Sequence, residues 1–206
     1  MCGRFNISYD LDDISKAYNI EYINGGTLIQ GEIFPGNTIP VVLDNTIRTL
    51  DFFKWGFQVK GLNREIINAR IETVLDKPTF RRAFLNNRCL IPANAFFEWK
   101  TTEKSKAKYK IQCMDTSLFS MAGIYNLFKD KNGNDYFGVV ILTCAANEEM
   151  SKLHHRMPVF IEKFQEETWF KTSKQELFKL KERLEKDSKP QLHISPAEGF
   201  QQLSMW

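Results

Sequence analysis

The residue with the most distinctive chemistry in this sequence is Cys2, which follows Met1. Removal of Met1 would place an α-amine and a thiol on one residue. At pH 7 roughly one α-amine in ten is neutral and nucleophilic, against about one lysine in a few thousand. Such an amine can form an imine with an aldehyde, and the thiol can then close a five-membered thiazolidine ring on the same carbon. Taken alone, however, a cysteine is more often a small buried side chain.

Polar residues interrupt otherwise apolar, strand-like sequence in four stretches. These are Cys2-Gly3-Arg4, Asn68-Ala69-Arg70-Ile71-Glu72-Thr73, Phe96-Phe97-Glu98-Trp99 and His154-His155-Arg156-Met157-Pro158. In this order, and with the segments Lys-Pro-Thr-Phe-Arg-Arg-Ala-Phe and Arg-Cys-Leu-Ile-Pro between them, they resemble the SOS response-associated peptidase (SRAP) family. The resemblance covers residues 1–161 and is densest over residues 68–100.

The resemblance implies a sensor of abasic sites in single-stranded DNA, acting in the DNA damage response. An abasic site is an aldehyde in equilibrium with its closed sugar. In the family the mature N-terminal Cys captures that aldehyde as a thiazolidine DNA–protein crosslink, a lyase-like chemistry. Removal of Met1 by self-processing is the source of the peptidase name. We therefore expect Cys2 to be the nucleophile, DNA to be the partner, and no cofactor to be needed.

Three further residues fit catalytic roles in this chemistry. Desolvation among aromatic rings favours the protonated form of a carboxyl group, which suits Glu98 to proton transfer. Its alternative is an outward-facing position on an alternating strand. His154 could move a proton when the sugar ring opens, although a structural histidine is the commoner case. Asn68 would orient the Cys2 amine or the captured sugar, or else cap a strand end.

The resemblance also suggests Arg4, Arg70 and Arg156 as DNA-binding residues. Guanidinium groups bind phosphate bidentately, and such contacts position a strand without selecting its sequence. The alternative for Arg70 or Arg156 is an internal ion pair with Glu72. Other arginines either widen the basic surface or are ordinary exposed charges; they are Arg81, Arg82 and Arg88.

The chain departs from the family pattern at several places, and two of them concern contact with DNA. Family members usually carry an Asn before an x-Ala-Pro-Gly segment, where this chain has Gly31-Glu32-Ile33-Phe34-Pro35-Gly36, so Glu32 replaces an amide. A carboxylate there disfavours phosphate. The Pro and Trp that commonly follow Trp-Gly-x are also missing from residues 58–61. These changes leave the aldehyde chemistry intact but alter how DNA bases would stack.

Two other classes of protein are compatible with parts of the sequence. Glutamine amidotransferases also begin Met-Cys-Gly, and there Cys2 would attack an amide with its own amine as base. They typically have an apolar residue where this chain has Arg4. The second alternative is a non-covalent single-stranded DNA-binding module. A peptidase acting on other proteins is disfavoured, because one self-cleavage needs no substrate groove.

The composition of the chain constrains its domain number, location and partners. A chain of 206 residues that is 43% hydrophobic predicts one domain, residues 1–206. No apolar run reaches the ~18 residues of a membrane span, and charges interrupt the start of the chain, so we expect a cytoplasmic protein. A monomer is also expected. The four cysteines lack zinc-site spacing. The net charge of +3 is too small to indicate DNA binding by itself.

Local patterns indicate the elements that position these residues. A short helix is predicted over residues 10–20, capped by Asp10, a hairpin over 38–53, a strand ending at Arg70, and a helix starting at 76–78. Strand-like runs follow at 89–91, 95–99, 109–113, 118–124, 136–143 and 157–161, with a tight turn at 132–133. Helices are predicted over 147–154 and 173–186. The pattern favours an α+β fold whose mainly antiparallel sheet forms a barrel-like core, with peripheral helices.

Overall fold

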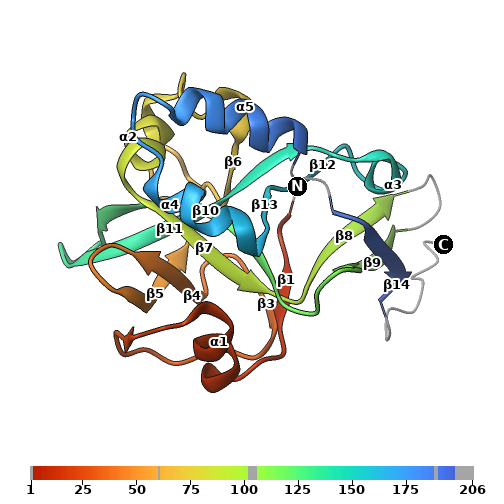
Figure 1. Cartoon of the computed structure of the whole chain (residues 1–206), viewed down its shortest axis with the longest axis horizontal. Coiled ribbons are helices and arrows are strands. Elements are labelled where there is room, and N and C mark those ends of the chain that lie inside the picture. The colour runs from red at the N-terminus through yellow and green to blue at the C-terminus, as the bar shows by residue number, and fades with distance from the viewer. Residues whose placement is uncertain (1, 60, 102–105, 188–189, 198–206) are drawn as a thin grey trace.

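The computed structural model describes residues 2–59, 61–101, 106–187 and 190–197 (Figure 1). Some of the predictions above concern residues outside these ranges, namely Met1, Lys60 and residues 198–206. The described part confirms the predicted fold class: most of its elements are strands in antiparallel pairs, and its helices lie at the periphery. No helix within these ranges is long and apolar enough to cross a membrane.

A closed barrel of five strands forms the core. Its members are β4 (Thr38–Asp44), β5 (Arg48–Trp55), β7 (Arg88–Ala93), β10 (Phe119–Lys129) and β11 (Asp135–Ala145). Four of the pairings around the ring are antiparallel, and the parallel pairing of β5 with β11 closes it. The middle of β11 is buried, as its apolar run predicts. The β4–β5 and β10–β11 hairpins are confirmed.

Short strands extend the barrel sheet at its edges. Both β6 (Asn68–Arg70) and β12 (Arg156–Pro158) pair with β11, whereas β13 (Phe160–Ile161) pairs with β10 and β2 (Tyr22–Ile23) pairs with β5. The single strand predicted over residues 157–161 is therefore wrong in detail. It is divided between two partners, and the division lies at Val159, whose amide donates to the Leu142 carbonyl oxygen.

A second sheet of five strands lies beside the barrel. Its order is β14 (Leu192–Pro196), β9 (Lys106–Cys113), β8 (Ala95–Thr101), β1 (Phe5–Ile7) and β3 (Gly31–Ile33), and all its pairs are antiparallel. Strand β1 lies between β8 and β3, so the residues that follow Cys2 occupy the interior of this sheet. Phe5 is buried and contacts Trp55 of the barrel edge-on, with ring centroids 5.1 Å apart.

Helices cover the outside of the two sheets (Figure 1). The bounds are α1 (Leu11–Tyr18), α2 (Pro78–Asn86), α3 (Glu148–Ser151), α4 (Glu166–Lys171) and α5 (Leu177–Asp187), with 3-10 turns η1 (Ile71–Thr73) and η2 (Lys163–Gln165). Asp10 caps α1 by accepting the Asp13 amide at 2.8 Å. Leucines of the predicted stripe on α5 are buried, although α5 begins at Leu177 rather than at residue 173, and α3 is shorter than predicted.

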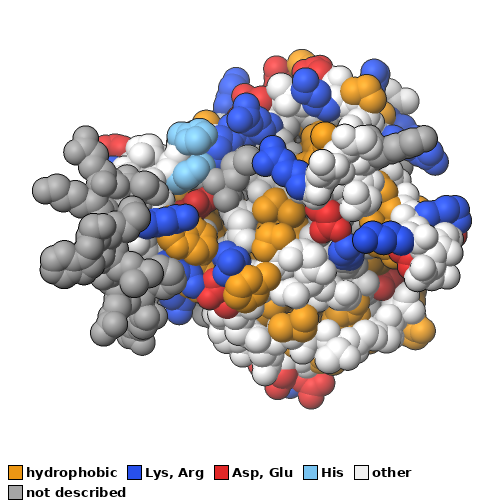
Figure 2. All heavy atoms as spheres, turned by 180° about the vertical axis from the view of Figure 1, so that it is seen from behind, with side chains coloured by type: hydrophobic (Ala, Val, Ile, Leu, Met, Phe, Trp, Pro, Cys, Tyr) orange, Lys and Arg blue, Asp and Glu red, His pale blue; other side chains and the backbone are white. Residues whose placement is uncertain are grey.

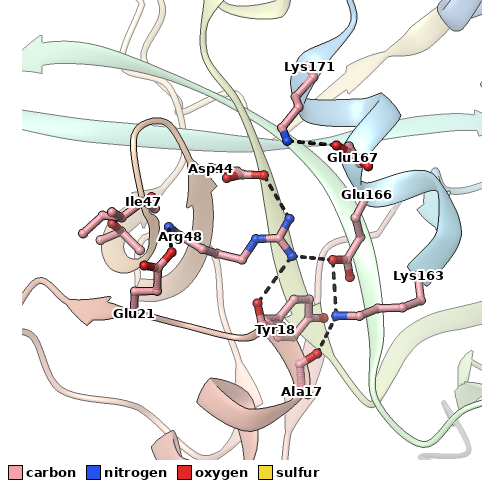
Figure 3. Close-up of polar contacts among 11 residues, drawn as sticks. Ala17, Tyr18, Glu21, Asp44, Ile47, Arg48, Lys163, Glu166, Glu167 and Lys171 are labelled. Carbon is pink, nitrogen blue, oxygen red and sulfur yellow. Dashed lines mark hydrogen bonds and ion pairs between the residues drawn. The ribbon is translucent and has the colours of Figure 1, made fainter.

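A charged network around Arg48 fastens two of the helices to the barrel (Figure 3). The guanidinium of Arg48 bonds Asp44 at 2.9 Å and Glu166 of α4 at 2.8 Å. It also donates to the carbonyl oxygen of Tyr18, the last residue of α1, at 3.4 Å. Lys163 supplies a second cation to Glu166 at 3.3 Å. Because Glu166 is buried, these partners are needed to offset its loss of water.

Arg88 is a second structural cation, so both alternatives given for it, part of a basic surface or an ordinary exposed charge, are wrong. Its guanidinium donates to five carbonyl oxygens, two in α2 and three in residues 169–172, at 2.7–3.3 Å. The carbonyl groups at the end of a helix lack internal partners and carry partial negative charge. Arg88 therefore joins the ends of α2 and α4 to β7.

Candidate functional site

Cys2 is fully buried at the entrance to β1. Its Sγ lies 3.7 Å from the carbonyl oxygen of Arg4, a weak thiol hydrogen bond within the same turn of chain. Burial raises the pKa of the Cys2 thiol, and the charge of nearby Glu98 raises it further. The thiol is therefore held in its neutral form.

Asn68 holds the backbone of Cys2 in place. It is a buried residue of β6, and its Nδ2 donates to the Cys2 carbonyl oxygen at 2.9 Å. The parallel register of β6 with β11 places Asn68 opposite Ile141. The preceding turn is fixed by the indole of Trp55, which donates to the Ile67 carbonyl oxygen at 3.0 Å. Asn68 thus contacts Cys2 directly.

Glu98 lies inside the protein, so the alternative of an outward-facing strand residue is wrong. Its residue exposure is 5%, and that of Phe97, on the opposite face of β8, is 6%. Both faces of β8 are covered here, so alternation of the strand does not expose either residue. The Oε1 atom of Glu98 lies 4.0 Å from Nδ1 of His154.

His154 follows α3 and is only partly exposed. The backbone amide of Arg156 donates to its Nδ1 at 3.0 Å, and the carbonyl oxygen of Arg156 lies 3.2 Å from the same nitrogen. Burial lowers the pKa of His154, although the charge of Glu98 acts in the opposite direction. The ring stacks on that of His155 at a centroid distance of 4.4 Å. A neutral imidazole next to Glu98 can both accept and return a proton.

The structure therefore brings together all the residues predicted to be catalytic. Cys2, Asn68, Glu98 and His154 come from the start of the chain, β6, β8 and the turn before β12. They are linked by the Asn68–Cys2 hydrogen bond, the electrostatic effect of Glu98 on Cys2, and the Glu98–His154 contact. The arrangement brings a buried thiol, a buried carboxyl group and a partly exposed imidazole together.

The arginines predicted to bind DNA have different surroundings. Arg156 is buried; its Nη2 donates to Glu72 at 2.8 Å and to the Thr143 carbonyl oxygen at 2.6 Å, and Nη1 bonds the other carboxylate oxygen of Glu72. The ion pair with Glu72 is thus present, and it supports the structural alternative for Arg156. Arg70 is exposed at the end of β6, where a phosphate could reach it.

Arg4 forms an ion pair with Glu32, a residue at which this chain departs from the family pattern. Its Nη1 lies 3.0 Å from Oε1 of Glu32, and its guanidinium lies 3.7 Å from the ring centroid of Phe34. The other oxygen of Glu32 pairs with Nζ of Lys108. The expected unfavourable charge of Glu32 is thus balanced by two cations, one of which, Lys108, was not predicted from the sequence.

A cavity of about 480 Å³ opens beside Asn68 and was not predicted. Pro35, Arg64, Glu65, Ile66 and Ile67 form the rest of its wall. These residues belong to two loops that are distant in sequence and lie side by side only in the folded structure.

On the face seen from behind, histidine side chains lie next to Lys and Arg side chains and near a hydrophobic area (Figure 2). Among the described residues, no group of three or more His, Cys, Asp or Glu is placed to hold a metal ion.

This combination of a barrel, a second sheet and a buried Cys2 site matches a known class of protein. The family model of SOS response associated peptidase (SRAP) matches residues 1–198, and the chain belongs to this family. Abasic site processing protein YoqW of Bacillus subtilis (strain 168) is 33% identical over 182 residues, covering 82% of this chain and 80% of that protein. Abasic site processing protein YedK of Escherichia coli (strain K12) is 26% identical over 168 residues, covering 78% and 75%.

Solved structures show the same fold. A protein from Bacteroides thetaiotaomicron superposes with a TM-score of 0.79 over 96% of this chain and 93% of that chain. Its sequence identity is 23%, so this likeness concerns the fold alone.

Proposed function

We propose that this protein processes abasic sites, by trapping their aldehyde in single-stranded DNA through Cys2. The observation that carries the proposal is the gathering of Cys2, Asn68, Glu98 and His154 in one site. Support comes from relatives such as YoqW and YedK, which are named abasic site processing proteins.

The covalent steps balance without a cofactor. After Met1 is removed, the Cys2 amine attacks the aldehyde carbon, and the resulting carbinolamine loses one water to give an imine. The thiol then adds to the imine carbon while its proton passes to the nitrogen. A thiazolidine results, with a net loss of one water. Reversal follows the same steps in the opposite order and needs water to return.

The surroundings of Cys2 suggest how these steps are helped. Because burial keeps the thiol neutral, its proton must leave as sulfur attacks, and Glu98 would relay that proton to the nitrogen. His154 would accept a proton as the closed sugar opens, which a neutral ring can do. Asn68 fixes the Cys2 carbonyl, and thereby limits the positions of the reacting nitrogen and sulfur.

DNA binding in this proposal depends mainly on the exposed cations around the site. Arg70 would contact a phosphate directly, whereas Arg4 is first paired with Glu32. Arg156 supports the site from within by joining η1 to β11 through Glu72 and Thr143. Such contacts hold the backbone without selecting bases.

The proposal is tested by mixing the protein with a single strand that carries one abasic site and separating the products on a denaturing gel. Cys2→Ala should form no adduct, while Cys113→Ser, a change at a half-buried thiol outside the site, should form as much as the wild type. An adduct that survives Cys2→Ala would contradict the proposal. If wild-type protein binds the strand but never forms an adduct, the non-covalent binding module becomes the better interpretation.

A further inference from the structure

Glu32 lies between two cations, one of which, Arg4, is two residues from Cys2. Its Oε1 accepts from Arg4 Nη1 at 3.0 Å, and its Oε2 accepts from Lys108 Nζ at 2.5 Å. Glu32 belongs to β3, Lys108 belongs to β9, and Arg4 directly precedes β1, so three separate segments of the chain contribute. Side-chain exposures are 26% for Glu32, 31% for Arg4 and 10% for Lys108. A carboxylate therefore bridges two partly desolvated cations at the surface of the second sheet.

Aromatic rings surround the same cations. The Arg4 guanidinium lies 3.7 Å from the Phe34 centroid and 5.8 Å from that of Trp99. Nζ of Lys108 lies 4.1 Å from the Phe97 centroid and 5.8 Å from that of Trp99. Cations interleaved with aromatic rings are the arrangement by which proteins hold single-stranded nucleic acid, through phosphate contacts and base stacking.

A polar cavity continues from this cluster along the sheet. Its volume is about 400 Å³, and Asn6, Glu32, Phe97, Lys108, Lys110 and Gln112 contribute to its wall. It brings a further lysine, Lys110, to the neighbourhood of the bridged pair. The cavity gives an extended ligand room to pass beside Glu32 without entering the barrel.

From this geometry we infer that Arg4 and Lys108 form a binding site for a DNA phosphate, and that Glu32 occupies it in the free protein. The carboxylate of Glu32 accepts from both cations, as a phosphate diester would. A strand must displace Glu32 to bind there. Glu32 is thus a specificity-determining residue, because it weakens the binding of any intact strand. A DNA strand then stays bound to the protein mainly when its aldehyde is captured covalently. This inference rests on the proposed function.

The physical basis is competition between two anions for the same donors. Glu32 pairs with the partly exposed Arg4 and with the buried Lys108, and its negative charge also repels a phosphate. Glu32→Gln removes the negative charge with nearly unchanged shape. The variant should bind an intact single strand about tenfold more tightly at low salt, or ~1.4 kcal/mol. Each additional phosphate that the protein neutralises should steepen the dependence of log K on log salt by about 0.7.

The experiment measures non-covalent binding of a fluorescent, undamaged single strand in a Cys2→Ala background. Glu32→Gln is compared with Glu167→Gln, which makes the same charge change at an exposed residue of α4 paired with Lys171. Only Glu32→Gln should tighten binding and steepen the salt dependence. Adding Lys108→Gln to Glu32→Gln should abolish most of the increase in affinity. Unfolding temperatures close to that of the parent show that these changes leave the fold intact.

The outcomes separate this inference from the function on which it rests. If Glu32→Gln matches the parent in affinity and salt dependence, or if Glu167→Gln tightens binding as much, the inference is overturned. Adduct formation by otherwise wild-type protein would still support the proposed function in that case. If neither the parent nor its variants bind the strand, and the wild type forms no adduct, both proposals fail together.

Discussion

The ion pair between Arg156 and Glu72 allows one prediction to be worked in detail. Arg156→Met keeps an unbranched apolar stem but removes the guanidinium. The change leaves the Glu72 carboxylate and the Thr143 carbonyl oxygen without the donors that now reach them. Side-chain exposure is 9% for Arg156 and 27% for Glu72. The stranded carboxylate is therefore only partly accessible to water.

The size of the effect follows from that exposure. Removing one partner of a fully buried ion pair costs about 3–5 kcal/mol. Because Glu72 retains some contact with water, we expect the lower end, about 3 kcal/mol. For a domain of this size, 1 kcal/mol corresponds to roughly 2–4 °C in the unfolding midpoint, so Arg156→Met should unfold about 6–12 °C lower.

The dependence on pH provides a second check. Burial raises the pKa of Glu72, but the hydrogen bonds and charge of Arg156 outweigh it and lower this pKa below its ordinary value. A lowered folded-state pKa means that the pair stabilises the protein above the ordinary pKa of Glu, and that this contribution is lost as the pH falls through the folded-state value. Without Arg156, burial favours the protonated carboxyl. The stability difference between the two proteins should therefore shrink on acidification.

Urea unfolding of both proteins at neutral pH and near pH ~4, about the ordinary pKa of Glu, measures this difference. The matched control is Arg70→Met, which removes the same charge from an exposed neighbour and should change stability by no more than about 0.5 kcal/mol. Equal stability of Arg156→Met and wild type at neutral pH would refute the structural role. If that variant instead lost only DNA affinity, Arg156 would be a phosphate ligand after all.

Three further predictions concern individual residues. Glu98→Gln should slow crosslink formation or reversal while the unfolding midpoint stays near that of the wild type; unchanged rates in both directions would make Glu98 structural. Arg70→Ala should weaken binding to single strands of different sequence by a similar factor and reduce the salt slope by about 0.7, and a loss confined to one sequence would count against a phosphate contact. Arg88→Met should lower the free energy of unfolding by about 2–4 kcal/mol, because partly buried carbonyl groups of α2 and α4 lose their donors; calorimetry showing wild-type stability would exclude that role.

Local signals in the sequence were sufficient for the elements that depend on nearby residues. Asp10 predicts the start of α1 because its side chain accepts an amide three residues later. The hairpin of β10 and β11 follows from the turn at Asn132-Gly133, and the apolar run in β11 predicts its burial. Closure of the barrel was not predictable in this way, because β5 and β11 are distant in sequence and leave no local signal of their pairing.

The residues of the candidate site were predicted from their types and from the family resemblance. The contacts between them were not. Alternation along β8 could not show that Glu98 is buried, because both faces of that strand are covered. The partner of Arg156 was left open between phosphate and Glu72, since a guanidinium suits either. The role of Arg88 was missed because its acceptors are backbone carbonyls, which carry no sequence signature. Lys108 became relevant only when β9 and β3 placed it against Glu32.

The central claim is that Cys2 captures an aldehyde covalently, and intact-protein mass measures it most directly. The protein is weighed before and after mixing with a single strand whose uracil base has been removed enzymatically. The account predicts that Met1 is absent and that the mass of the strand is added with the loss of one water. A protein that lacks Met1 but gains no mass, or one that gains mass equally well as Cys2→Ala, would contradict it.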